Sequence, residues 1–416
     1  MSIQLIVGLL FTITAMAGFI NYKFIKLPNS IGLTLVTLIL SVTLMILGKF
    51  GLALDAYFAN ILHEINFTRT VMDFMLSFIL FAGSLHINVS HMYNFRWVIA
   101  QLATFGVVIS TILIGFSVYG INYLFNLNLP IFYCFLFGAL ISPTDPIAVL
   151  GVLKRIEAPK SLEIKIAGEA LFNDGVGIVL FTMLLSIMIG TNSDFDLTHT
   201  TLYLIQEVFG GILVGFLLGR MAKFFIKRVG SFDIVLSLTL ALVTGGYALA
   251  NEVLHVSGAI AMAVAGLVIG LACREGKMPA HIVTQLEHFW QWVDELLNAI
   301  LFVLIGFVVL FLLYDLKLIA VSLLVIPTVL IARYLSVILP VLSSHRFRKF
   351  NHTTVALMTW GGLRGGVSIA LALSIPQELD GRQIIITMTY IVVMFSIIVQ
   401  GITIGPLIKR SVASAV

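Results

Sequence analysis

The sequence predicts an all-α protein that crosses a membrane about thirteen times. Of its 416 residues, 60% are hydrophobic and 11% are charged, and the mean hydropathy is +1.09. Soluble domains carry about 25% charged residues, so this composition excludes a soluble globular protein. The apolar runs are continuous, whereas the strands of a membrane β-barrel would appear as short alternating segments.

The individual spans follow from the apolar runs, because each run is long enough for a helix to cross the hydrocarbon core. We expect spans at residues 2–20, 30–48, 68–87, 97–121, 129–152, 162–189, 203–226, 232–252, 256–272, 287–313, 316–343, 353–375 and 383–408.

Loop charge supports this count, because Lys and Arg concentrate in cytoplasmic loops. When residues at span ends (Arg69, Lys223 and Lys317) are counted with the adjoining loop, 16 of the 24 Lys and Arg residues fall in one set of alternate loops, 4 in the other and 4 within spans. We therefore expect a cytoplasmic C-terminus and an external N-terminus. The net charge of +4 comes from these loops, so we expect no nucleic-acid partner.

The chain reads as one transmembrane domain over residues 1–416. Val416 follows the last span closely, so we expect no soluble C-terminal regulatory domain. The absence of long tails favours a multi-pass protein of a prokaryotic inner membrane.

An odd count with strict alternation also permits two inverted six-helix repeats joined by one span, as in many secondary transporters. The fifth span of each repeat then carries helix breakers at depth: Ser142-Pro-Thr-Asp-Pro146 in one and Gly361-Gly-Leu-Arg-Gly-Gly366 in the other. An interior proline removes a helix hydrogen bond, and each glycine weakens a helix by about 1 kcal/mol. Paired interrupted helices indicate a transporter's binding site, and ordinary membrane-helix kinks are the alternative.

Asp174 is the acidic residue that most favours an ion site. It lies in Gly168-Glu-Ala-Leu-Phe-Asn-Asp-Gly175, inside a long apolar run. A carboxylate at that depth costs about 3 kcal/mol or more to insert, so it usually has a function. Na⁺ and a proton would compete for it, which gives obligatory exchange if only the occupied carrier reorients. Hard cations prefer oxygen ligands, and we expect them from Asp174, the Asn173 amide and carbonyls freed near Thr144.

Asp145 has two possible roles. Pro146 suits the first turn of a new half-helix, so Asp145 would cap that half-helix and offset its positive end. A direct role as an ion ligand is the alternative.

Glu169 lies five residues before Asp174, about 140° around a helix, so the two carboxylates do not share a face. A buried carboxylate needs a basic partner, and Arg333 and Arg364 are the candidates. We expect Glu169 to pair with Arg333, in an ion pair whose role could be purely structural. We expect Arg364 to neutralise the helix dipole ends at the second break.

Other chemistry has little support in the sequence. Cys134 and Cys273 lie far apart in apolar segments, so neither a disulfide framework nor a metal site follows from them. We find no set of nucleophile, base and orienting residue, and we expect neither enzymatic activity nor a cofactor. A cation channel is an alternative, but the breaks are paired within one chain and there is no filter-like loop.

The motifs resemble those of the cation/proton antiporter superfamily. The similarity is to the branch of electroneutral Na⁺/H⁺ exchangers that includes NhaP-type prokaryotic antiporters and the animal sodium/hydrogen exchangers. It covers the whole membrane region in the same order, and the motifs are specific only together. They are Thr144-Asp145-Pro146, Gly168-Glu169 followed by Asn173-Asp174-Gly175, Arg333 in its apolar helix, and Gly361-Gly-Leu-Arg-Gly365.

The resemblance implies an NhaA-like antiporter fold surrounded by membrane lipids. It implies a homodimer in which each protomer has a dimerisation subdomain and a mobile core, roughly residues 97–189 and 316–408, with elevator-like alternating access. Asp174 would carry Na⁺ (or Li⁺) and H⁺ in turn, with Asn173 and the Thr144 main chain nearby. Members with Asn before the Asp typically exchange one Na⁺ for one H⁺, so we expect electroneutral exchange.

Two points remain open in the sequence. Many members have Ser directly after the motif Glu, and this chain has Ala170 there. If that hydroxyl is an ion ligand, a water molecule or Asn173 would have to replace it. A K⁺/H⁺ antiporter of the same fold is the nearest alternative, because the oxygen ligands alone do not set ion size.

Overall fold

The computed structural model describes residues 3–50, 70–87, 89–155, 160–190, 197–276, 278–312, 315–343 and 352–413. Within these ranges the regular secondary structure is helical, apart from a single antiparallel bridge between Asp145 and Leu363. Nine helical segments of the described chain are long and apolar enough to cross a membrane. The predicted all-α, multi-span membrane architecture is therefore confirmed.

The nine long segments include several that continue through π-helical or 3-10 turns. They are α1 (Ile3–Ile20) with η1 (Asn21–Ile25), α2 (Asn29–Lys49), α7 (Arg96–Gln101) with η3 (Leu102–Gly106) and α8 (Val107–Phe125), α11 (Lys160–Met188), α12 (Leu197–Ile226), α13 (Phe232–Ala248) with η4 (Leu249–Val253), α15 (Ala280–Phe307) with η5 (Val308–Phe311), α16 (Leu316–Ser343), and α19 (Arg382–Phe395) with η7 (Ser396–Gln400) and α20 (Gly401–Ala413).

The other four predicted spans are shorter or interrupted helices. Residues 68–87 hold η2 (Thr70–Met75) and α5 (Leu76–His86), and residues 256–272 hold α14 (Gly258–Arg274). The two spans with predicted breaks each form two half-helices. These are α9 (Ile131–Ile141) with α10 (Ile147–Arg155), and α17 (His352–Trp360) with α18 (Gly366–Ser374). A short surface helix, α6 (Val89–Asn94), follows α5.

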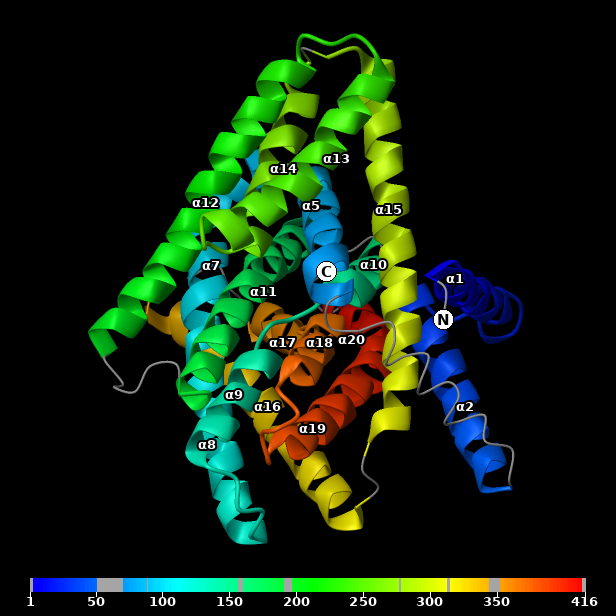
Figure 1. The fold of residues 1–416 in the computed structure, drawn as a ribbon, viewed down its shortest axis with the longest axis vertical. Helices are drawn as coiled ribbons and strands as arrows, with labels where there is room; N and C mark the ends of the chain where they lie inside the picture. Colours follow the sequence, from blue (N-terminus) through cyan, green and yellow to red (C-terminus); the bar gives the residue numbers. More distant parts are fainter. Residues whose placement is uncertain are drawn as a thin grey trace.

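Helices α5, α12 and α14 pack closely because glycines line their contacts. A Cβ at Gly215 of α12 would lie 2.2 Å from the Ala261 carbonyl oxygen of α14. A Cβ at Gly266 of α14 would lie 1.9 Å from Ser84 Oγ of α5. Lipid supplies no hydrophobic driving force between helices, so small residues stabilise the contact by letting backbones approach. Figure 1 shows α12, α13 and α14 together in the upper part of the molecule.

A second group packs around large apolar side chains from α8, α9, α16, α18 and α19. The fully buried residues of this cluster include Ile114, Phe137, Val325, Ile369 and Met388. The long helix α15 runs past both groups (Figure 1). Its early residues pack with α5 and α13, and its later residues pack in the second cluster. The two broken helices meet inside the second group, beside α15.

Candidate ion-binding site

The two helix breaks lie against each other. The backbone N–H of Asp145 donates to the carbonyl of Leu363 at 2.8 Å, which forms the antiparallel bridge. Four half-helix ends therefore meet at one place: the C-terminal ends of α9 and α17 and the N-terminal ends of α10 and α18. Such ends carry partial charges, negative at the C-terminus and positive at the N-terminus.

Arg364 lies at the negative end of α9. Its Nη1 donates to the carbonyl oxygens of Ser142 at 2.8 Å and Pro143 at 3.0 Å. Its backbone N–H donates to Ser396 Oγ at 2.9 Å. We expected Arg364 to serve the second break, where it stands in the sequence. The structure corrects this, because its guanidinium reaches across the crossing to the carbonyls that the first break leaves unpaired.

Asp145 lies at the positive end of α10. Its Oδ1 accepts from the Ile147 backbone N–H at 2.8 Å, which is the capping geometry. The carboxylate packs directly on Gly365, where a Cβ would lie 2.2 Å from Oδ2. A carboxylate and a guanidinium thus occupy the opposite dipole ends of the first broken helix.

Asn173 joins α11 to the first break. Its Nδ2 donates to Thr144 Oγ1 at 2.8 Å, and both residues are buried. The amide oxygen of Asn173 is also buried and has no hydrogen-bond partner in the described part of the chain. Asp174 follows it directly in α11, with Asp145 among the charged groups near it. The four expected ion ligands therefore come together, with an amide oxygen left over as an acceptor.

Glu169 and Arg333 form a buried, two-point ion pair. Arg333 Nη2 donates to Glu169 Oε2 at 2.9 Å and Nη1 donates to Oε1, and the side chains are only 2% and 6% exposed. Arg333 Nη2 also reaches the Met358 carbonyl at 3.3 Å. Gly362 leaves room for the guanidinium, since a Cβ there would lie 2.7 Å from Nε. The pair links α11, α16 and the second broken helix.

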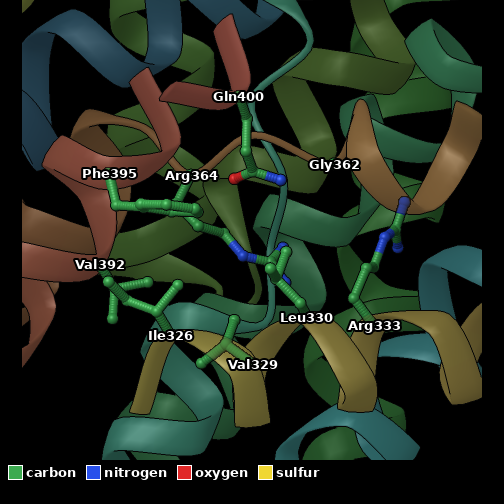
Figure 2. Close-up of a pocket in the computed structure, with 9 residues that line it drawn as sticks. All are labelled: Ile326, Val329, Leu330, Arg333, Gly362, Arg364, Val392, Phe395 and Gln400. Carbon is green, nitrogen blue, oxygen red and sulfur yellow. The ribbon is translucent and has the colours of Figure 1, made fainter. Parts of the chain in front are cut away.

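A pocket of about 10 Å³ lies behind the crossing, between α16, α19 and the second break. Figure 2 shows the side chains of Arg333 and Arg364 among the residues that line the pocket, with their guanidinium groups apart from each other. Gln400 also lines the pocket, and its amide nitrogen donates to the Trp360 carbonyl at 3.0 Å.

Sequence reasoning missed Ser396 and Gln400, which hold the second break from the π turn η7. Their only signal was polarity within the apolar run 383–408.

Comparisons with known proteins identify the family to which this chain belongs. The family model described as "Sodium/hydrogen exchanger, transmembrane" matches residues 9–410. The Na⁺/H⁺ antiporter NhaP of Pseudomonas aeruginosa is 41% identical over 97% of this chain and 96% of its own length. NhaH of Halobacillus dabanensis, also named a Na⁺/H⁺ antiporter, is 32% identical over 93% of each chain.

The sodium proton antiporter MjNhaP1 of Methanocaldococcus jannaschii, solved at pH 8, has the same fold. It superposes with a TM-score of 0.75 over 99% of both chains, at 22% identity. The resemblance stated from the motifs is thus confirmed, and the chain belongs to the sodium/hydrogen exchanger family.

Proposed function

We propose that this chain exchanges Na⁺ (or Li⁺) for H⁺ across a membrane, with Asp174 binding the cation and the proton in turn. The observation that carries the proposal is the buried Asn173 Oδ1, an acceptor without a partner beside Asp174 at the crossing. The relatives named as Na⁺/H⁺ antiporters support the choice of ions.

The proposed ligands are the Asp174 carboxylate, Asn173 Oδ1, the Thr144 main chain and Asp145. Asp174 loses a proton before it binds Na⁺, and a proton displaces Na⁺ when it returns. Because the Na⁺-loaded and the protonated states carry the same net charge, one Na⁺ exchanges for one H⁺. Asn173 adds no charge of its own, which supports electroneutral stoichiometry. Ala170 supplies no oxygen, so the Asn173 amide takes a larger share of coordination.

Alternating access is proposed to come from two inverted six-helix repeats within thirteen spans. The mobile core would comprise residues 97–189 and 316–408, and the remaining helices would form a dimerisation subdomain. The close packing of α5, α12 and α14 through glycines suits a rigid scaffold for this movement. We propose a lipid-embedded homodimer in a prokaryotic inner membrane, with a cytoplasmic C-terminus.

The test uses purified protein in liposomes with a trapped pH dye. Na⁺, Li⁺ or K⁺ is added outside, and valinomycin with K⁺ clamps the membrane potential in the Na⁺ and Li⁺ runs. We expect Na⁺-driven proton efflux that the clamp leaves unchanged and that Asp174→Asn abolishes. Asp233→Asn, at an exposed first-turn position of α13, is the matched control and retains exchange.

Three other results of the liposome assay would contradict parts of this proposal. A response to K⁺ alone would indicate a K⁺/H⁺ antiporter of the same fold. Cation conductance without coupled proton movement would favour a channel, and full activity in Asp174→Asn would refute the assignment of that residue.

A further inference from the structure

Helix α15 carries two pairs that join an amide and a carboxylate one helical turn apart. Gln291 Nε2 donates to Glu295 Oε1 at 2.9 Å, and Asn298 Nδ2 donates to Asp294 Oδ1 at 2.9 Å. Residues four apart on a helix are neighbours, so both contacts are local. The two pairs share their chemistry and differ in their surroundings.

Burial separates the two pairs. Gln291 and Glu295 are exposed, whereas Asn298 is only 4% exposed. The Asn298 Oδ1 atom is buried without a hydrogen-bond partner in the described chain. A buried hydrogen-bond acceptor without a partner costs folding free energy. The unpaired Asn298 oxygen therefore indicates a ligand that comes from outside the protein.

The orientation of the Asn298 amide follows from its neighbour. An ionised carboxylate only accepts hydrogen bonds, so Asp294 must face the amide nitrogen, and the oxygen is then directed elsewhere. Asn173 is arranged in the same way, with its nitrogen on Thr144 and its oxygen unpartnered. In both residues the nitrogen is fixed and an oxygen acceptor is left in a buried place.

Asn298 lies one turn from a contact between α15 and the helix crossing. Leu301, one turn further along α15, lies directly on Gly366, where a Cβ would be 2.5 Å from Leu301 Cδ1. Gly366 begins α18, and the Asp145 carboxylate packs on the preceding residue, Gly365. Residues three apart are neighbours on a helix surface, so Asn298 shares with Leu301 the side of α15 that packs against α18.

We infer that Asn298 is an additional cation ligand, whose Oδ1 binds the alkali cation from α15 while Asp294 holds the amide in place. An alkali cation suits the position because it is a hard ion that takes neutral amide oxygens as ligands. Asp294 is partly exposed, whereas the Asn298 amide that it holds is buried. The inference rests on the proposed function, and it makes cation affinity depend on α15 as well as on α11.

The experiment measures Na⁺ affinity in two ways, with Asn298→Leu, Asn298→Ala and the control Gln291→Leu. One assay is the KM for Na⁺ in proteoliposomes. The other is the Na⁺ concentration that half-saturates thermal stabilisation of the purified protein, which needs no transport. We expect both Asn298 variants to raise both values about tenfold, the loss expected for one polar contact to an ion, with a smaller change in maximal rate. Gln291→Leu should leave both within twofold of the parent.

The outcomes separate the inference from the proposed function. If Asn298→Leu fails to fold, Asn298→Ala decides, because it removes the same oxygen with less volume. Unchanged Na⁺ affinity in a folded Asn298 variant overturns the inference, and so does an equal shift in Gln291→Leu. If the parent shows no exchange but Na⁺ still stabilises it, the proposed function fails. The stabilisation assay then still tests whether Asn298 binds Na⁺. If Na⁺ neither drives exchange nor stabilises the parent, both are overturned.

Discussion

Breaking the ion pair between Glu169 and Arg333 should strongly destabilise the protein. Arg333→Gln leaves the Glu169 carboxylate, whose residue is 1% exposed, without a counter-charge and without its two guanidinium donors. Removing one partner of a buried pair typically costs about 3–5 kcal/mol, because the remaining charge stays desolvated. We expect a loss in this range for Arg333→Gln and for Glu169→Gln.

The double variant should be less damaging than the sum of the two single variants. With both charges removed, two neutral amides remain and no buried charge is left uncompensated. We expect a coupling free energy of about 2 kcal/mol between the two positions. Unfolding of the purified protein, followed by tryptophan fluorescence in detergent across a denaturant series, provides the four free energies.

The exposed pair at Glu275 serves as the matched control. Lys223 and Lys227 both donate to Glu275 at the surface, where ion pairs contribute about 1 kcal/mol or less. Glu275→Gln should therefore change stability far less than Glu169→Gln. Single-variant losses that add within about 0.5 kcal/mol in the double variant would refute the reasoning about the buried pair.

Three further predictions test the packing and the surface charges. Gly365→Ala places a Cβ 2.2 Å from Asp145 Oδ2, so we expect Na⁺-driven exchange in proteoliposomes to fall about tenfold; unchanged exchange would mean that Asp145 need not keep its place. Gly215→Leu forces α12 from the α14 backbone and should lower thermal stability by about 3 kcal/mol, whereas Gly120→Ala, with open space around it, should not lower it. Hydrogen bonds from Lys223 and Lys227 lower the pKa of Glu275 from 4.5 to about 2. Because the folded-state pKa is the lower one, this stabilisation is present above pH 4.5 and is lost as the pH falls towards 2. The difference in melting temperature between the parent and Glu275→Gln should shrink across that window, and a constant difference would argue against the ion pair.

Sequence reasoning could find the components of the site because a charge or a breaker in an apolar helix is conspicuous. Asp174, Glu169 and Arg333 stand in long apolar runs, where an ionised side chain is costly and therefore informative. The same cost requires a partner for Glu169, which limited the choice to two arginines. The capping position of Asp145 followed from the proline beside it.

Residues with ordinary polarity were harder to find. Ser396 and Gln400 hold the second break through a hydroxyl and an amide, and such groups occur in membrane helices without a site. Asn298 stands in the sequence near Asp294 and Glu295, a polar stretch that does not by itself indicate a site. The unpaired state of its oxygen became visible once burial and neighbours were known.

The sequence by itself determined that this protein is a bundle of membrane helices with two interrupted spans and a deep carboxylate. Those features depend on local chemistry: apolar length, proline and glycine within helices, and charge at depth. Only the tertiary structure decided that Arg364 contacts the carbonyls of the first break, and that Arg333, of the two candidate arginines, is the one that pairs with Glu169 across 164 residues of chain. Partners so distant in sequence are set by how helices pack, and packing depends on the shapes of all the side chains together.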